Sequence, residues 1–264
     1  MDIRRSGEWG ELIDWPLVAI HSIVMQNGKV MTFGTDVSGH QGAMMVHDVW
    51  DPVTGQHQLL EHHMHTPTDI FCAAAVLLPG TNKVLIAGGD SRGEGRPINM
   101  GVNDVNVYDI DTGEMHPATD GEMQAARWYP TTIALPTGQV LAIGGSDANG
   151  VGVATPELYT PGQGWRSLPG ATDQDVADFF DYPKTWVAQD GTVYYFANGR
   201  GADGVQDLVA LDPSGEGSIK KIASMPFTAA WESPAIMFDT GKVLISDTPD
   251  AITRSRNAAT LEEA

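Results

Sequence analysis

The sequence predicts an all-β fold built from repeated units, and three observations support this. An apolar strand, a short turn and a second apolar strand recur along the chain, and no segment has helical periodicity over three turns. The residue before the valine of each second strand marks the repeat: Lys29, Lys83, Gln139, Thr192 and Lys242. These residues are 54, 56, 53 and 50 positions apart (83−29, 139−83, 192−139, 242−192). That period is close to the roughly 50 residues of a kelch-type propeller blade.

Each unit also has a second half that reads as strand, turn and strand. The turn segments 51–55 and 109–113 contain the Asp, Pro and Gly residues of tight hairpins. Glycine pairs at 88–89 and 144–145 close second strands, where small residues let neighbouring strands approach. Four strands per unit predict a kelch-type β-propeller with about four complete blades and part of a fifth. Short helices are expected only at 173–180 and in the tail at 257–264.

The repeat predicts a single propeller domain over residues 1–264. The expected blades cover residues 16–66, 67–122, 123–172 and 173–227, with a partial blade at 228–250 and a tail at 251–264. A blade buries its faces against its neighbours, so an open array leaves an apolar flank uncovered. We therefore expect the chain to be part of a longer propeller; a closed ring of four or five blades is the alternative.

Composition limits the partners. The formal net charge is −19 and the isoelectric point is near 4.5, so the surface field repels phosphate backbones and anionic lipid. No apolar run approaches the roughly 20 residues of a membrane span. The N-terminal residues lack the apolar segment of a signal peptide. One cysteine excludes an internal disulfide. We expect no nucleic-acid partner and no membrane span.

The lone cysteine and one tyrosine occupy the same position in successive repeats. Cys72 lies seven residues before Pro79, and Tyr129 lies seven residues before Pro136. If the units are adjacent blades, the two side chains begin neighbouring inner strands on one rim of the propeller. The bland alternative is a small buried thiol and a tyrosine that packs with its hydroxyl at the rim.

The segments around these two residues carry a family resemblance. The sequence TDIFC ending at Cys72 and the sequence RWYP at 127–130, each followed by a turn and a Gly-Gly pair, resemble the galactose oxidase/glyoxal oxidase family of copper radical oxidases. The opening segments WPLVAIH at 15–21 and FGTD at 33–36 are similar to bacterial members. The resemblance extends over essentially the whole chain.

The resemblance implies a cofactor made from side chains. In this family the matching cysteine and tyrosine are joined by a thioether, so Cys72 and Tyr129 would be that pair. The modified tyrosine ligates copper and holds the radical that oxidises a primary alcohol or aldehyde, while O2 is reduced to H2O2. A phenolate is a hard anionic ligand suited to Cu(II), and an ortho thioether makes the ring easier to oxidise. Family analogy also implies an extracellular protein.

The chain departs from the family pattern in two ways. The family also uses a second tyrosine followed directly by a histidine, and another later histidine, whereas here all eight histidines lie between His21 and His116. Tyr129 with Cys72 cannot hold copper tightly, so the isolated chain is predicted to be inactive. Galactose oxidase has a tryptophan after its Gly-Gly-Ser segment, stacked over the thioether; here Asp147 follows 144–146. This argues against galactose specificity and favours a glyoxal-oxidase-like or other substrate.

Further candidates are weaker. Tyr182 lies nine residues before Gly191, as Tyr129 lies nine before Gly138, so Tyr182 is expected on the same rim. The equivalent residue in the fifth unit is Glu232. Asp147, Tyr182 and Glu232 are candidate rim or substrate contacts, and each is also explained by rim packing or hydration. Histidines 62, 63 and 65 could bind copper or zinc, or be solvated loop residues. A non-catalytic kelch module that binds a protein or carbohydrate is the alternative function.

Overall fold

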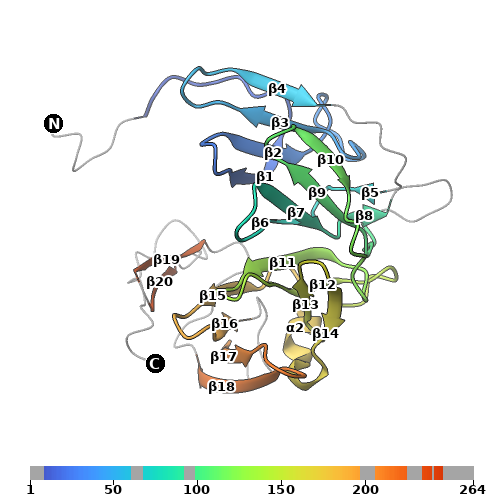
Figure 1. The fold of residues 1–264 in the computed structure, drawn as a ribbon, viewed down its shortest axis with the longest axis vertical. Coiled ribbons are helices and arrows are strands. Elements are labelled where there is room, and N and C mark those ends of the chain that lie inside the picture. Colours follow the sequence, from blue (N-terminus) through green and yellow to red (C-terminus); the bar gives the residue numbers. More distant parts are fainter. Residues whose placement is uncertain are drawn as a thin grey trace, which may run out of the picture.

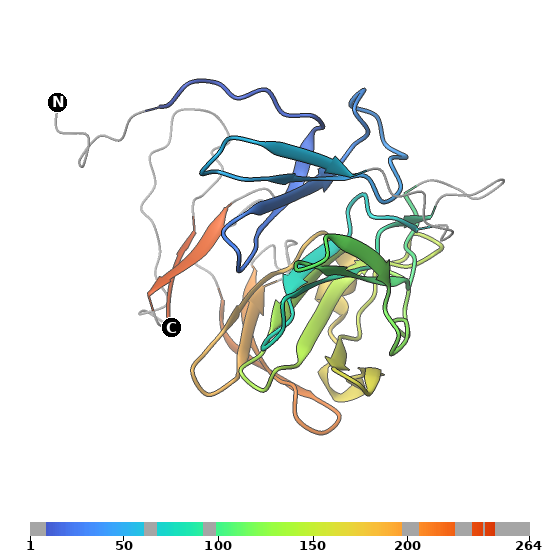
Figure 2. The ribbon, with the colours of Figure 1, turned by 45° about the horizontal axis from the view of Figure 1, so that its top comes forward.

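Strands form nearly all the regular structure in the computed structural model, which describes residues 9–60, 68–91, 99–196, 206–224, 234–239 and 241–245. Among these residues the strands form four antiparallel sheets of four strands each, a two-stranded hairpin and one small additional sheet. The sheets follow one another in chain order along an arc (Figures 1 and 2). This arrangement confirms the predicted all-β, propeller-like fold.

Each sheet consists of four strands taken in chain order, each antiparallel to its neighbours. The first sheet contains β1 Ala19–Val24, β2 Val30–Gly34, β3 His47–Trp50 and β4 His57–Leu60. The second contains β6 Ala74–Leu77, β7 Lys83–Ala87, β9 Val105–Asp109 and β10 Glu114–Pro117. Strands β5 Thr68–Asp69 and β8 Asp90–Ser91 pair beside the second sheet.

The second half of the chain repeats this plan. The third sheet contains β11 Trp128–Ala134, β12 Val140–Ser146, β13 Glu157–Thr160 and β14 Gly164–Ser167. The fourth contains β15 Lys184–Val187, β16 Val193–Phe196, β17 Asp207–Asp212 and β18 Ser218–Ser224. Strands β19 Ala235–Asp239 and β20 Lys242–Ile245 form the final hairpin. The division of the chain into blades at the predicted limits, within one domain, stays a prediction.

The only helices among the described residues connect the third and fourth sheets. They are η1 Pro169–Ala171 and α2 Gln174–Asp178, and Asp173 caps α2 by accepting a hydrogen bond from the backbone N–H of Asp175. The short helix expected at 173–180 is therefore a single turn, and the helix expected in the tail lies outside the described residues. Neither helix has the length or apolar character needed to cross a membrane.

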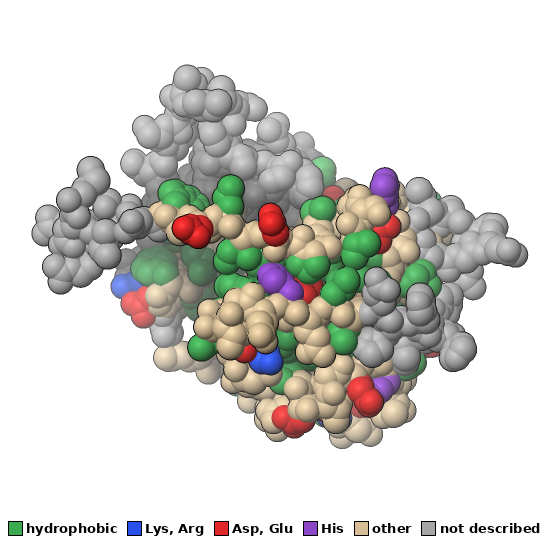
Figure 3. Space-filling view, turned by 90° about the horizontal axis from the view of Figure 1, so that it is seen from above, with side chains coloured by type: hydrophobic (Ala, Val, Ile, Leu, Met, Phe, Trp, Pro, Cys, Tyr) green, Lys and Arg blue, Asp and Glu red, His purple; other side chains and the backbone are tan. Residues whose placement is uncertain are grey.

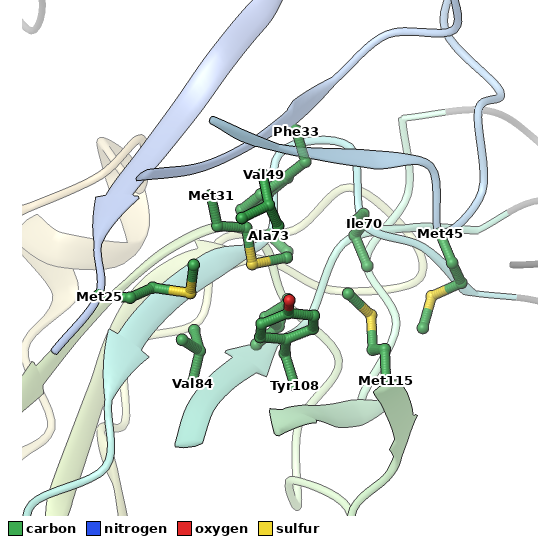
Figure 4. Close-up of a cluster of buried hydrophobic side chains, with 11 residues drawn as sticks. Met25, Met31, Phe33, Met45, Val49, Ile70, Ala73, Val84, Tyr108 and Met115 are labelled. Atoms are coloured by element: carbon green, nitrogen blue, oxygen red, sulfur yellow. The ribbon is translucent and has the colours of Figure 1, made fainter. Parts of the chain in front are cut away.

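The core lies between successive sheets because alternate residues of a strand point to opposite faces. In β7, Val84 and Ile86 pack towards the first sheet, whereas Leu85 and Ala87 pack towards the third. Figure 4 shows the cluster between the first two sheets, where methionines and Phe33 surround Tyr108. Equivalent clusters lie between the third and fourth sheets and between the fourth sheet and the final hairpin.

The first sheet and the final hairpin carry apolar side chains at the surface. Val24 in β1 is 65% exposed, and Ile236 in β19 is 62% exposed. Figure 3 shows hydrophobic side chains reaching the surface between polar ones on the face seen from above. Such exposure contrasts with the inner sheets, where both faces are covered by a neighbouring sheet.

Candidate functional site

Cys72, Tyr129 and Tyr182 lie at the same end of three neighbouring first strands. Cys72 is two residues before β6, Tyr129 is the second residue of β11, and Tyr182 is two residues before β15. Strand β11 contacts both β6 and β15 (Figure 1). The repeat offset therefore brings the three residues together at one end of these strands, which we call the rim.

The backbone at all three positions has a left-handed conformation. The φ angles are +60° at Cys72, +66° at Tyr129 and +44° at Tyr182, a region that residues other than glycine rarely adopt. The Tyr129 N–H donates to the Cys72 carbonyl at 3.1 Å, and the Tyr182 N–H donates to the Tyr129 carbonyl at 2.9 Å. These two hydrogen bonds connect the starts of the three strands, which belong to three different sheets.

Glycines in the second strands make this close approach possible. A Cβ at Gly88 would lie 2.3 Å from the Arg127 carbonyl oxygen, and a Cβ at Gly144 would lie 2.5 Å from the Pro183 ring. The glycine that follows each of these two residues donates a backbone hydrogen bond to the next sheet's first segment. The Gly89 N–H, for example, donates to the Arg127 carbonyl at 3.0 Å. The Gly-Gly pairs thus let the following sheet pack its first strand directly against the preceding sheet.

A buried ion pair anchors the segment that carries Tyr129. Arg127 is fully buried, and its guanidinium donates to the carboxylate of Glu157 at 2.9 Å. It also donates to the carbonyls of Gly144 at 2.6 Å and Thr155 at 2.7 Å. A buried charge is tolerated only when it is paired and hydrogen-bonded, so this network fixes the backbone two residues before Tyr129.

The thiol of Cys72 lies between two phenols. It is 2% exposed, and it interacts with the side-chain hydroxyls of Tyr129 and Tyr182. Burial raises the pKa of Cys72 to about 12, and burial likewise raises the pKa of both tyrosines above the usual value. In the resting protein all three groups are therefore protonated at neutral pH.

An aromatic stack covers Tyr129. The rings of Trp128 and Tyr129 are stacked with centroids 3.9 Å apart and an interplanar angle of 16°. The ring of Tyr182 lies 4.8 Å from that of Tyr129. The sequence pattern predicted no shielding group here, because the position expected to shield the tyrosine is occupied by Asp147, which follows residues 144–146. The structure supplies a tryptophan from the adjacent position in the chain.

A histidine from the first sheet joins this group. His21 of β1 stacks on Phe33 with centroids 4.9 Å apart, and its Nε2 lies 3.2 Å from the Tyr182 hydroxyl. Burial lowers the pKa of His21 to about 4, so its imidazole is neutral. Sequence reasoning missed this residue; the available signal was an ionisable side chain two positions after Ala19, the residue that the repeat aligns with Cys72.

The remaining candidates are placed differently. The Asp147 carboxylate accepts hydrogen bonds from the N–H groups of Asn149 at 2.8 Å and Val151 at 2.9 Å, so it closes its own turn. Glu232 and histidines 62, 63 and 65 lie outside the described residues. Among the residues that are described, no three His, Cys, Asp or Glu side chains gather as a metal site.

Known proteins with similar sequences include a galactose oxidase and an aldehyde oxidase. Galactose oxidase of Gibberella zeae is 30% identical over 173 residues, which is 62% of this chain and 23% of that protein. The chain is similar to galactose oxidase. Aldehyde oxidase GLOX of Vitis pseudoreticulata is 31% identical over 50% of this chain and 24% of that protein. The predicted resemblance to galactose oxidase and glyoxal oxidase is thereby confirmed.

The structural comparison supports the fold. A fungal alcohol oxidase of the AA5 family, solved in complex with copper, superposes with a TM-score of 0.67 and 20% identity, over 90% of this chain and 49% of that chain. No family model matches the sequence. The chain spans about a quarter of the length of the curated relatives it matches.

Proposed function

We propose that Cys72 and Tyr129 form part of a copper radical oxidase site that oxidises a primary alcohol or aldehyde with O2. The observation that carries the proposal is that the buried Cys72 thiol interacts with the Tyr129 hydroxyl, while the Tyr129 N–H donates to the Cys72 carbonyl at 3.1 Å. Trp128 stacks on the same tyrosine, as a shielded aromatic group requires. The similarity to galactose oxidase and to an aldehyde oxidase supports the reaction class.

The donor atoms fit a copper half-site. The Tyr129 phenol oxygen would be the ligand, because an anionic oxygen suits Cu(II). Copper bound there would supply one-electron redox chemistry. The chain would supply a ring modified by Cys72, shielding by Trp128, and a backbone fixed by Arg127. We propose that the remaining ligands come from residues outside this chain, since no histidine follows Tyr129.

Cross-linking Cys72 to Tyr129 is the modification that the geometry favours. The Cys72 Sγ would bond to the ring carbon next to the Tyr129 hydroxyl, with loss of the thiol hydrogen and one ring hydrogen. The two electrons and two protons released would reduce one O2 to H2O2. The two side chains already interact, so little rearrangement would be needed for the sulfur to reach the ring carbon at which it would attach.

The substrate class follows from the same resemblance. We infer a small alcohol, aldehyde or carbohydrate, and, by family analogy, an extracellular setting. By the resemblance, Asp147 would take the place of the stacking tryptophan of galactose oxidase; its carboxylate accepts hydrogen bonds within its own turn. A galactose-specific contact at this position is therefore not part of the proposal.

Mass spectrometry of the intact chain, prepared with and without Cu(II) in air, tests the proposal. The expected result is a loss of two hydrogens that peptide mapping assigns to a Cys72–Tyr129 cross-link. Cys72→Ser and Tyr129→Phe should each abolish the mass loss. A free thiol in folded, copper-treated protein would contradict self-processing by this chain, and would favour either a kelch binding module or a half-site that needs the remaining ligands. The chain alone is expected to produce no H2O2 from added alcohols.

A further inference from the structure

Tyr182 connects three other side chains at the rim. Its ring lies 4.8 Å from that of Tyr129, and its hydroxyl interacts with the Cys72 thiol. The same hydroxyl lies 3.2 Å from Nε2 of His21, which is 161 residues earlier in the chain. Tyr182 therefore connects His21 of the first sheet to the two residues between which the cross-link is proposed.

The backbone that carries Tyr182 is fixed. Its φ is +44°, and its N–H donates to the Tyr129 carbonyl at 2.9 Å. Pro183 follows directly and packs against Gly144 so closely that a Cβ there would lie 2.5 Å from the proline ring. With the main chain held, only the two side-chain torsions of Tyr182 remain to be set by its neighbours.

His21 is suited to hold the Tyr182 hydroxyl. Its ring stacks on Phe33 at 4.9 Å and an interplanar angle of 22°, which fixes the imidazole plane. A neutral imidazole accepts at one nitrogen, so the Tyr182 O–H can donate to Nε2. The same hydroxyl oxygen can accept from the Cys72 S–H, and the Cys72 sulfur can accept from the Tyr129 O–H. Each of the four groups then has a compatible role.

We propose that Tyr182, held by His21, is a positioning residue that keeps the Cys72 sulfur directed at Tyr129. The proposal rests on the proposed function, since the positioned pair is the one that would be cross-linked. Tyr182 would act in two ways: its ring would limit the rotation of Tyr129, and its hydroxyl would hold the thiol. His21 would act only through the Tyr182 hydroxyl.

Three variants separate these contributions. Tyr182→Phe keeps the ring but removes the hydroxyl, His21→Leu removes the acceptor, and His21→Gln restores an acceptor oxygen. Tyr159→Phe is the matched control, because the buried Tyr159 also loses a side-chain hydrogen bond, to Asp120 at 2.6 Å, away from the rim. Near-ultraviolet circular dichroism confirms that each variant is folded before it is assayed.

The first readout is the rate at which the Cys72–Tyr129 cross-link forms in air with Cu(II). Tyr182→Phe and His21→Leu should slow it by about tenfold or more, since small misplacements of reacting groups are costly. His21→Gln and Tyr159→Phe should stay within about twofold of the unmodified chain, because neither changes what the Cys72 sulfur contacts. The Tyr182→Phe/His21→Leu double variant should be no slower than the single variants. Equal rates in all variants would overturn the proposal.

The second readout needs no metal and separates the two proposals. Cys72 is alkylated with iodoacetamide in metal-free protein, and Tyr182→Phe and His21→Leu should raise the rate about fivefold by loosening the thiol. If the unmodified chain forms no cross-link but these alkylation rates rise, self-processing by this chain fails and the positioning role stands. If alkylation is unchanged in both variants, the positioning role fails, whatever happens to the cross-link.

Discussion

The guanidinium of Arg127 and the carboxylate of Glu157 lie 2.9 Å apart with both side chains buried. Glu157 also accepts from the backbone N–H groups of Gln124 and Ala125, so the pair ties two turns and the start of β11 together. Arg127 lies just before β11, two residues from the tyrosine on which the proposed chemistry depends, and Glu157 begins β13.

Removing one partner of this pair should strongly destabilise the chain. Arg127→Met leaves the Glu157 carboxylate buried without its cation, and we expect a loss of about 3–5 kcal/mol in the free energy of unfolding. Lys83→Met is the control, because the exposed Lys83–Asp109 pair at 3.8 Å should contribute less than about 1 kcal/mol. Urea unfolding measures both. Similar losses of unfolding free energy in the two variants would show that the buried pair stabilises the chain no more than the exposed pair does.

Cys72 should react very slowly in the folded, metal-free chain. Burial raises the pKa of its thiol to about 12, so little reactive thiolate exists at pH 8. We expect alkylation by iodoacetamide to be at least about a hundredfold slower than in urea, where the pKa returns to roughly 8.5. Mass spectrometry follows the label, and Cys72→Ser should take up none. Rapid labelling of the native chain would mean that the thiol is exposed.

His21 should make the chain sensitive to acid. Burial lowers the pKa of His21 to about 4 in the folded state, whereas the unfolded value is near 6.5. The unfolded chain therefore binds more protons between these values, and stability falls as the pH drops from 6.5 towards 4. The loss reaches about 3 kcal/mol by pH 4.

Comparison with His21→Gln isolates this effect from the titration of carboxylates. The difference in unfolding free energy between the two proteins should shift against the unmodified chain as the pH falls from 7 to 4. Urea unfolding at each pH gives the difference, and a value independent of pH would show that His21 titrates normally in the folded chain.

Two glycines with the same backbone conformation should differ in their tolerance of alanine. Gly28 has a φ of +80° and nothing near its missing Cβ, whereas Gly88 has a φ of +75° and the Arg127 carbonyl at 2.3 Å. Gly28→Ala should cost about 1–2 kcal/mol through the backbone alone. Gly88→Ala should cost at least about 2 kcal/mol more, because the third sheet must move. Thermal or urea unfolding of the two variants decides this.

The fold was predictable because strand periodicity and a repeat of constant length are local properties of the sequence. The Cys72–Tyr129 contact was predictable for a related reason: equal offsets within successive repeats bring residues to the same end of neighbouring strands. His21 was missed because its contact with Tyr182 joins the first and fourth sheets. Equal positions within repeats predict contacts between adjacent units only. They do not predict which side chains of more distant units come into contact.

Trp128 was missed for a different physical reason. Consecutive residues in a strand normally point to opposite faces, so Trp128 and Tyr129 are not expected to stack. The left-handed φ of +66° at Tyr129 breaks this alternation, and Trp128 pairs with Ser146 while Pro130 pairs with Gly144. The local sequence does not predict the left-handed conformation at Tyr129, because tyrosine rarely adopts it.

The left-handed backbone at Cys72, Tyr129 and Tyr182 also bears on how this protein could be improved as a catalyst. Each non-glycine residue in that region costs about 1–2 kcal/mol, and glycine would remove the cost. A screen that rewards heat resistance alone would therefore favour glycine at these three places and erase the thiol and both phenols. Engineering for robustness should hold these positions constant and seek its gains elsewhere in the sheets.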